Sequence, residues 1–140
     1  MEAAYTVEAL STGNGRDGHV TAMDGALEFE MRTPKEMGGA GGGVNPEALF
    51  ASGYAACFHS ALRMVGGQEK ADLGDSTVGA RVSIGDNGQG GFQLAVALEV
   101  VIPNLPHDQA QRLADAAHRV CPYSNATRGN IEVTVTVTDD

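Results

Sequence analysis

One long and nearly apolar stretch, from Asn45 to Gly67, constrains the fold of this chain more than any other feature. Asn45 can cap the first free N–H groups of a helix, Pro46 suits the first helical position, and Glu47 lies favourably near the positive end of the helix dipole. Gly66 and Gly67 mark the expected end of the helix. The residues between these signals leave almost no polar face, so we predict one long helix that is buried all round.

Three segments before this helix alternate as strands do. They are residues 4–9, residues 19–22 and residues 26–32. Turn-forming residues separate them, first in STGNGRDG and then at Asp24-Gly25, so we predict an antiparallel meander. The glycine-rich segment from Met37 to Val44 matches neither common phosphate-binding pattern, and we interpret it as an adaptable loop that leads into the helix.

The segments after the helix predict two further strands, a second helix and a closing strand. The strands are expected at residues 78–84, residues 92–102 and residues 131–137. The strand at 92–102 is apolar on both faces, which is typical of a central strand covered on both sides. The second helix follows Pro103 and Pro106 and is expected to end at Pro122, with SNATRGN as a loop after it. One face of this helix is apolar and carries Ala110, Leu113, Ala114, Ala117 and Cys121.

The length, composition and net charge of the chain limit which class of protein it can belong to. With 140 residues, of which 42% are hydrophobic, we expect a globular α+β protein with a single domain over residues 1–140. No run is apolar enough to span a membrane and the first residues lack a signal-peptide pattern, so we expect a cytoplasmic protein. The net charge of -9 argues against nucleic acid and anionic membranes as partners.

The two cysteines, Cys57 and Cys121, are the leading candidates for chemistry. Cys57 lies at the centre of the apolar helix and Cys121 on the apolar face of the second, so both thiols should point into the core. Whether they meet is not decided by the sequence. Free cysteines usually behave as small buried hydrophobes, so inert core thiols remain open beside redox chemistry.

A reactive Cys57 would need a nearby cation, because the thiolate is the nucleophile and the middle of a helix gains nothing from the dipole. Arg63 lies six positions further along the same helix and therefore faces elsewhere. Arg16, in a glycine-rich loop, and Arg128, in the segment after Cys121, are better placed. Each of these two also fits a solvated loop arginine.

Glu47 has two interpretations. It is either a first-turn acid that stabilises the helix dipole or the residue that orients the arginine. In a straight helix Glu47 and Cys57 are about 15 Å apart along the axis. An arginine that reaches both would need a bend near Gly53, a suitable loop path, or a second subunit.

Two other kinds of site have weaker support. His118 and Cys121 form an HxxC pair that could be half of a zinc site, but no second half has a recognisable spacing, so we expect no metal. A cysteine hydrolase needs a histidine base beside its thiol, and His59 should point to nearly the opposite side of the helix from Cys57.

Four segments resemble the organic hydroperoxide resistance (Ohr) proteins of the Ohr/OsmC superfamily. The most specific are NPEALFASGYAACF around Cys57 and VCPYSNATRGNIEV around Cys121, and GRDGHV around Arg16 and TPKEMGGAGGGVNPE before the helix are similar to the same family. The resemblance covers essentially the whole chain in the right order. It implies an OsmC-like α+β fold, with an antiparallel sheet packed on a long buried central helix plus a second helix, in an intertwined homodimer.

The resemblance also implies a function, a thiol-dependent peroxidase for alkyl and fatty-acid hydroperoxides. It assigns Cys57 as the peroxidatic thiol, Cys121 as the resolving thiol that forms an intramolecular disulfide with it, Arg16 as the cation that stabilises the thiolate, and Glu47 as the acid that holds Arg16. It implies a lipoylated protein as dithiol reductant and no bound cofactor. The alternative from another class is a non-catalytic binding protein whose apolar interior is a small-molecule pocket and whose cysteines are inert.

Overall fold

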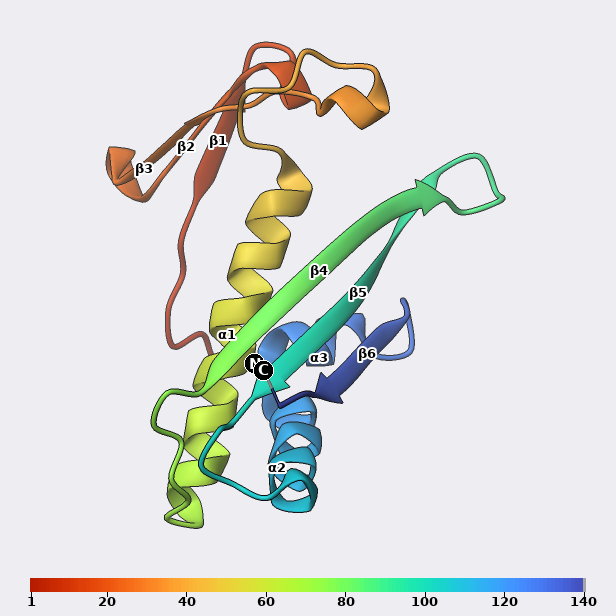
Figure 1. Cartoon of the computed structure of the whole chain (residues 1–140). Coiled ribbons are helices and arrows are strands. Elements are labelled where there is room, and N and C mark those ends of the chain that lie inside the picture. The colour runs from red at the N-terminus through yellow and green to blue at the C-terminus, as the bar shows by residue number, and fades with distance from the viewer. Residues whose placement is uncertain (140) are drawn as a thin grey trace. The chain divides into compact units, whose positions relative to one another are not determined.

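The computed structural model describes residues 1–139, which form two compact units (Figure 1). The first unit runs from Met1 to Leu49 and the second begins at Phe50. Each unit has its own three-stranded sheet, and the long helix α1 (Pro46–Gln68) starts at the end of the first unit and continues through the second. The single domain expected over residues 1–140 stays a prediction.

The first unit is the predicted antiparallel meander. Its strands, β1 (Ala9–Thr12), β2 (His19–Ala22) and β3 (Leu27–Glu30), pair in that order. Short 3₁₀ turns accompany them: η1 (Gly15–Asp17), η2 (Met23–Gly25) and η3 (Lys35–Met37). The expectation of a first strand at residues 4–9 was wrong for most of its length, because β1 extends from Ala9 into the turn-rich segment, where Thr12 pairs with His19.

The second unit contains a mixed sheet. Its strands are β4 (Thr77–Asp86), β5 (Phe92–Val101) and β6 (Val133–Val137), with β5 in the centre as predicted. β4 and β5 are antiparallel, but β5 and β6 are parallel, which departs from the expected antiparallel sheet. The chain between β5 and β6 passes through two helices, and a crossover of this length is what allows a parallel pair.

Helix α1 packs one face against this sheet and α2. Its buried hydrophobic side chains recur every three or four positions, as one helix face requires, and are Tyr54, Phe58, Ala61, Leu62 and Val65. They share a core cluster with the inner face of β5, which includes Leu98 and Val100. Ala56 and Met64 on the other side of α1 are exposed. Within the single chain α1 is therefore buried on one face, not all round as predicted.

The structure confirms the predicted start of α1, but the predicted end is wrong. The cap at Asn45 is confirmed, since its Oδ1 accepts a hydrogen bond of 2.8 Å from the N–H of Ala48. At the other end the helix continues through Gly66 and Gly67 to Gln68. Gly66 lies inside the helix and is buried against Leu73. Its lack of a side chain therefore serves close packing and not helix termination.

The second half of the unit holds α2 (His107–Val120) and α3 (Pro122–Thr127). The apolar face predicted for α2 is confirmed, because Ala110, Leu113, Ala114, Ala117 and Cys121 are all buried. The loop expected after Pro122 was wrong, because Pro122 is the first residue of α3, a position that proline favours. Cys121 joins the two helices in an extended conformation. No helix within residues 1–139 combines the length and the hydropathy needed to cross a membrane.

Candidate functional site

The two cysteines meet in the core of the second unit. Their Sγ atoms are 3.7 Å apart, with the Cys121 thiol donating to Cys57. Cys121 is fully buried and Cys57 is partly buried, and both are free thiols. A disulfide has an S–S length of about 2.05 Å, so bond formation requires the sulfurs to approach by less than about 2 Å. The structure thus places together two thiols that the sequence left separate.

The surroundings of Cys57 oppose its ionisation. Burial raises the pKa of the Cys57 thiol, the N–H of Tyr123 partly opposes this rise by donating to the sulfur, and the neighbouring Cys121 adds to it. Desolvation acts in this direction because it disfavours the charged thiolate. At neutral pH the environment within the second unit therefore keeps Cys57 protonated, and any nucleophilic role needs positive charge from elsewhere.

Arg16 and Glu47 form a two-pronged ion pair in the first unit. Arg16 Nη1 donates to Glu47 Oε2 over 2.8 Å, and Nη2 donates to Oε1 over 2.6 Å. The hydrogen bonds from Arg16 lower the pKa of Glu47, and those to Glu47 raise the pKa of Arg16. The Glu47 side chain is only 14% exposed, and that of Arg16 is 35% exposed. Such a fork fixes the plane of a guanidinium as well as its position.

The loop that carries Arg16 is anchored on its far side. The carboxylate of Asp17 accepts hydrogen bonds from the N–H and the hydroxyl of Thr33, each of 3.0 Å. The N–H of Met31 donates to the carbonyl of Gly18 over 2.9 Å. A Cβ at Gly18 would lie 2.2 Å from the carbonyl oxygen of Thr12, so only glycine fits there. These contacts hold the loop that carries Arg16 in a defined conformation.

A buried polar network adjoins the thiol pair. The Tyr54 hydroxyl lies 2.9 Å from Ser124 Oγ and 3.1 Å from Thr127 Oγ1. Ser124 Oγ is also 2.8 Å from Nδ1 of His118. Among the described residues no buried side-chain nitrogen or oxygen lacks a partner, so this network is complete.

The sequence of the chain matches a known protein family. A model of the family described as OsmC-like protein matches residues 39–136. The chain is 50% identical to the organic hydroperoxide resistance protein of Xanthomonas axonopodis pv. citri over 135 residues, which are 95% of this chain and 94% of that protein. The chain belongs to the organic hydroperoxide resistance branch of the OsmC-like family.

Solved structures support the same family assignment. The crystal structure of an organic hydroperoxide resistance protein from Elizabethkingia anophelis has a TM-score of 0.94 and 52% identity, covering 100% of both chains. The crystal structure of OhrB from Bacillus subtilis has a TM-score of 0.88 and 42% identity, covering 97% of this chain and 100% of that chain. The resemblance found in the motifs is thereby confirmed.

The positions of His59 and His118 in this Ohr chain do not fit the roles considered for them, a base beside Cys57 and a metal ligand. His59 Nε2 lies 3.0 Å from Ser76 Oγ and does not contact Cys57. His118 contacts Ser124, and within residues 1–139 no group of three or more His, Cys, Asp or Glu side chains is arranged to hold a metal ion. Burial lowers the pKa of both histidines, so the neutral ring is the form that the fold favours at each.

The other candidate arginines have partners of their own. Arg63 donates to the carbonyl of Leu73 over 3.3 Å. Arg128 donates to Asn125 Oδ1 over 2.7 Å and to the carbonyl of His118. Arg128 therefore joins α2 to α3.

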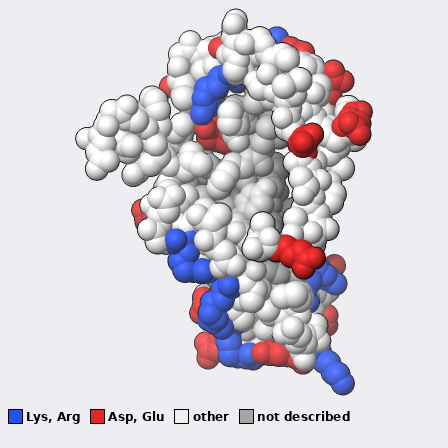
Figure 2. Space-filling model, turned by 180° about the vertical axis from the view of Figure 1, so that it is seen from behind, with Lys and Arg blue, Asp and Glu red and all other residues white. Residues whose placement is uncertain are grey.

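On the face of the Ohr chain that Figure 2 shows, Lys and Arg side chains are interspersed with Asp and Glu side chains.

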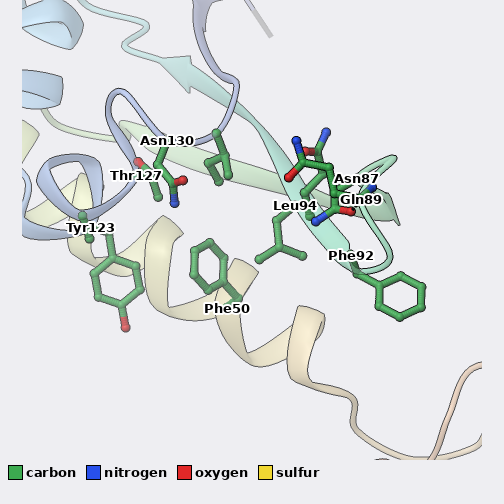
Figure 3. Close-up of a pocket in the computed structure, with 11 residues that line it drawn as sticks. Phe50, Asn87, Gln89, Phe92, Leu94, Tyr123, Thr127 and Asn130 are labelled. Carbon is green, nitrogen blue, oxygen red and sulfur yellow. Dashed lines mark hydrogen bonds between the residues drawn. The ribbon is translucent and has the colours of Figure 1, made fainter.

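An open pocket of about 750 Å³ lies in the second unit between the start of its α1 segment, the β4–β5 hairpin and the α3 region (Figure 3). Phe50 and Leu94 point into it, while the Phe92 ring turns outward. Tyr123, whose N–H contacts Cys57, also lines it. Asn87 and Gln89 add amide groups at the hairpin end.

Five residues of these networks were not predicted from the sequence: Asp17, Thr33, Tyr54, Ser124 and Thr127. The contact between Asp17 and Thr33 had no specific signal, because an aspartate before a glycine indicates only a turn or loop. For Ser124 and Thr127, the signal was available in the signature VCPYSNATRGN, which contains both at the spacing of one helical face. Their partner Tyr54 is about seventy residues away, and no local pattern reveals such a contact.

Proposed function

We propose that this protein is a thiol-dependent peroxidase that reduces alkyl and fatty-acid hydroperoxides to alcohols in defence against oxidative stress. The observation that carries the proposal is the pair of free thiols, Cys57 and Cys121, 3.7 Å apart in an apolar core. Membership of a family whose relatives are named for organic hydroperoxide resistance supports the substrate class.

In the first step the Cys57 thiolate attacks the outer oxygen of the hydroperoxide. A sulfur–oxygen bond forms, the O–O bond breaks, and Cys57 is oxidised to a sulfenic acid. The leaving alkoxide takes a proton and departs as the alcohol. An apolar wall favours such substrates, because each buried CH₂ group contributes about 0.8 kcal/mol of binding, whereas hydrogen peroxide has no carbon chain to bury.

Arg16 is proposed as the cation that makes this step feasible at neutral pH. Burial raises the pKa of Cys57, so a guanidinium near the sulfur is needed to favour the thiolate. The same group stabilises the charge that develops on the departing oxygen. Glu47 is proposed to hold Arg16 in the orientation that both tasks need, which its two short hydrogen bonds support.

In the second step Cys121 resolves the sulfenic acid. Its sulfur attacks Cys57, the S–O bond breaks, and the thiol proton leaves with the hydroxyl as water. The product is an intramolecular disulfide. We further propose that a lipoylated protein, through its dithiol, reduces this disulfide by thiol–disulfide exchange, and that no bound cofactor or metal takes part.

The assembly is proposed to be an intertwined homodimer in the cytoplasm. The exposed side of α1 supports a partner subunit, since Met64 is 52% exposed and Ala56, two turns earlier, is exposed as well. Apolar residues on a helix that a single chain covers on one face are typical of surfaces buried by association.

A thiol titration tests the function. One equivalent of cumene or fatty-acid hydroperoxide is expected to consume both thiols of the reduced protein within seconds, giving a product 2 Da lighter. Cys57→Ser should leave the hydroperoxide unreacted, while Cys121→Ser should consume it once and then stall at a sulfenic or overoxidised Cys57. Two thiols that persist in the wild-type protein after this treatment would reject the proposal.

The pocket beside Tyr123 favours one alternative, a binding protein with inert cysteines. In that case an organic hydroperoxide or a similar apolar molecule would bind without loss of thiols. The same titration separates the two, because binding without reaction leaves Cys57 and Cys121 free for alkylation by maleimide.

A further inference from the structure

The hydrogen bond between Tyr54 and Ser124 runs beside the contact between the two thiols. Tyr54 precedes Cys57 by three residues on α1, and Ser124 follows Cys121 by three residues at the start of α3. Tyr54 and Cys57 therefore lie on the same face of α1, while Cys121 directly precedes the first residue of α3. The hydroxyl pair, at 2.9 Å, and the sulfur pair, at 3.7 Å, therefore cross the same gap between α1 and the segment that carries Cys121.

The proton count gives this network a direction. Thr127 Oγ1 donates its one proton to the carbonyl of Ser124, so it accepts from Tyr54. Tyr54 then has no second proton and accepts from Ser124, which in turn accepts from Nδ1 of His118. The order of donation is His118, Ser124, Tyr54, Thr127. A neutral His118 accordingly carries its proton on Nδ1.

Burial makes this network hard to replace. Tyr54 and Ser124 are 0% exposed and Thr127 is 5% exposed. Water has no direct access to Tyr54 or Ser124, so removal of a hydroxyl that either one bonds to leaves a buried partner unsatisfied. Helix α3 has only six residues, too few to hold its own conformation in isolation. Its contacts with Tyr54, together with those that His118 and Arg128 make between α2 and α3, constrain where α3, and with it Cys121, lies.

We propose that Tyr54, through Ser124 and Thr127, is the positioning residue for the resolving thiol and controls how fast Cys121 captures the sulfenic acid of Cys57. This inference rests on the proposed function and deepens it. The step itself forms the S–S bond and breaks the S–O and S–H bonds, with water as the other product. The competing reaction is a second hydroperoxide that oxidises the same sulfenic acid to sulfinic acid.

The experiment compares Tyr54→Phe with Tyr5→Phe, the same chemical change at a tyrosine that is 71% exposed. Reduced protein is mixed with one equivalent of cumene hydroperoxide, quenched at intervals with dimedone and N-ethylmaleimide, and analysed by mass spectrometry. For Tyr54→Phe we expect hydroperoxide consumption within twofold of wild type, disulfide formation slowed at least tenfold, and accumulation of the dimedone adduct. At a tenfold excess of hydroperoxide, sulfinic acid should exceed disulfide. Tyr5→Phe should match wild type throughout.

A second pair of variants separates positioning from loss of the fold. Thr127→Ser keeps the accepting hydroxyl and should retain a resolving rate within threefold of wild type, whereas Thr127→Val removes it and should behave like Tyr54→Phe. A ¹⁵N NMR measurement on His118 should find the Nδ1–H tautomer in wild type. Disulfide formation at the wild-type rate in both Tyr54→Phe and Thr127→Val would overturn the inference while hydroperoxide consumption still upheld the function. A wild-type protein that consumes no hydroperoxide would overturn the function itself.

Discussion

Two adjacent glycines in α1 offer matched substitutions with opposite expected effects. Gly66 is buried, and a Cβ added there would lie 2.3 Å from Leu73 Cδ1 and 2.9 Å from Leu73 Cγ. Gly67 is exposed, and a Cβ there would meet nothing within 4 Å. Both residues lie within the helix and neither has a positive φ, so alanine suits the backbone at each.

The magnitudes follow from two competing effects. Alanine in place of glycine stabilises a helix by about 0.5–1 kcal/mol. At Gly67 only this effect acts, reduced by fraying near the helix end, so Gly67→Ala should stabilise the protein by about 0.5 kcal/mol. At Gly66 the added methyl group forces the buried Leu73 to move, and overpacking of this kind costs about 1–3 kcal/mol. The net effect of Gly66→Ala should be a loss of about 1–2 kcal/mol.

Thermal and urea unfolding at one fixed protein concentration measure both changes. For a chain of this length Gly66→Ala should lower Tm by about 3–6 °C, and Gly67→Ala should raise it by about 1–2 °C. In a Leu73→Ala background the penalty of Gly66→Ala should shrink, because the clashing methyl groups are gone. If Gly66→Ala stabilised the protein as much as Gly67→Ala, the close packing argued for Gly66 would be refuted.

Three other perturbations test the site and its surroundings. Arg16→Ala should lower kcat/KM for an organic hydroperoxide at least a hundredfold at pH 7, which is about 2.7 kcal/mol. The rate should partly recover at high pH, where Cys57 ionises unaided. A rate within threefold of wild type at pH 7 would reject Arg16 as the cation that stabilises the thiolate. The ratio of kcat/KM for cumene hydroperoxide to that for hydrogen peroxide should be at least ten, and equal values would contradict the apolar-wall argument. Hydrogen bonds to Glu30 and then to Glu28 raise the pKa of His19, so its pairing stabilises the fold fully below about pH 6.5 and is lost as the pH rises through the raised value. His19→Gln should therefore lower Tm more at pH 6 than at pH 9, and equal losses at the two pH values would argue against this pairing.

Those parts of the fold that depend on local pattern could be predicted. The capped start of α1, the apolar face of α2 and the alternation in β4, β5 and β6 all follow from neighbouring residues, and the structure confirms them. The misses have tertiary causes. β1 is defined by its pairing with β2, which includes Thr12 opposite His19, and not by its own alternation. Helix α3 is too short to be stable by propensity, and contacts with Tyr54 hold the segment that the sequence presents as a loop.

At the site, too, local features could be predicted and tertiary contacts could not. Both cysteines were expected in the core from their helix faces, but their contact depends on how α1 packs against the α2–α3 junction, which no spacing rule gives. The pairing of Arg16 with Glu47 joins residues thirty-one positions apart; the residues alone left it open that Glu47 orients an arginine, and the family resemblance assigned Arg16 to it. The hydroxyls that surround Tyr54 were not anticipated, because tyrosine, serine and threonine in apolar segments carry no sign of whether they bond to one another.

The burial of Cys57 has two opposed consequences for the proposed reaction, and the proposed role of Arg16 addresses both. The apolar setting holds Cys57 against Cys121 and would favour the proposed organic substrate, yet burial raises the pKa of the Cys57 thiol. A guanidinium has five N–H donors, and Glu47 accepts one from each terminal nitrogen. Three donors remain, one on each terminal nitrogen and one on Nε. In the role proposed for it, Arg16 would be held by Glu47 and would still have donors for a thiolate and for a peroxide oxygen, which a lysine ammonium with three donors in all could not offer in one fixed orientation.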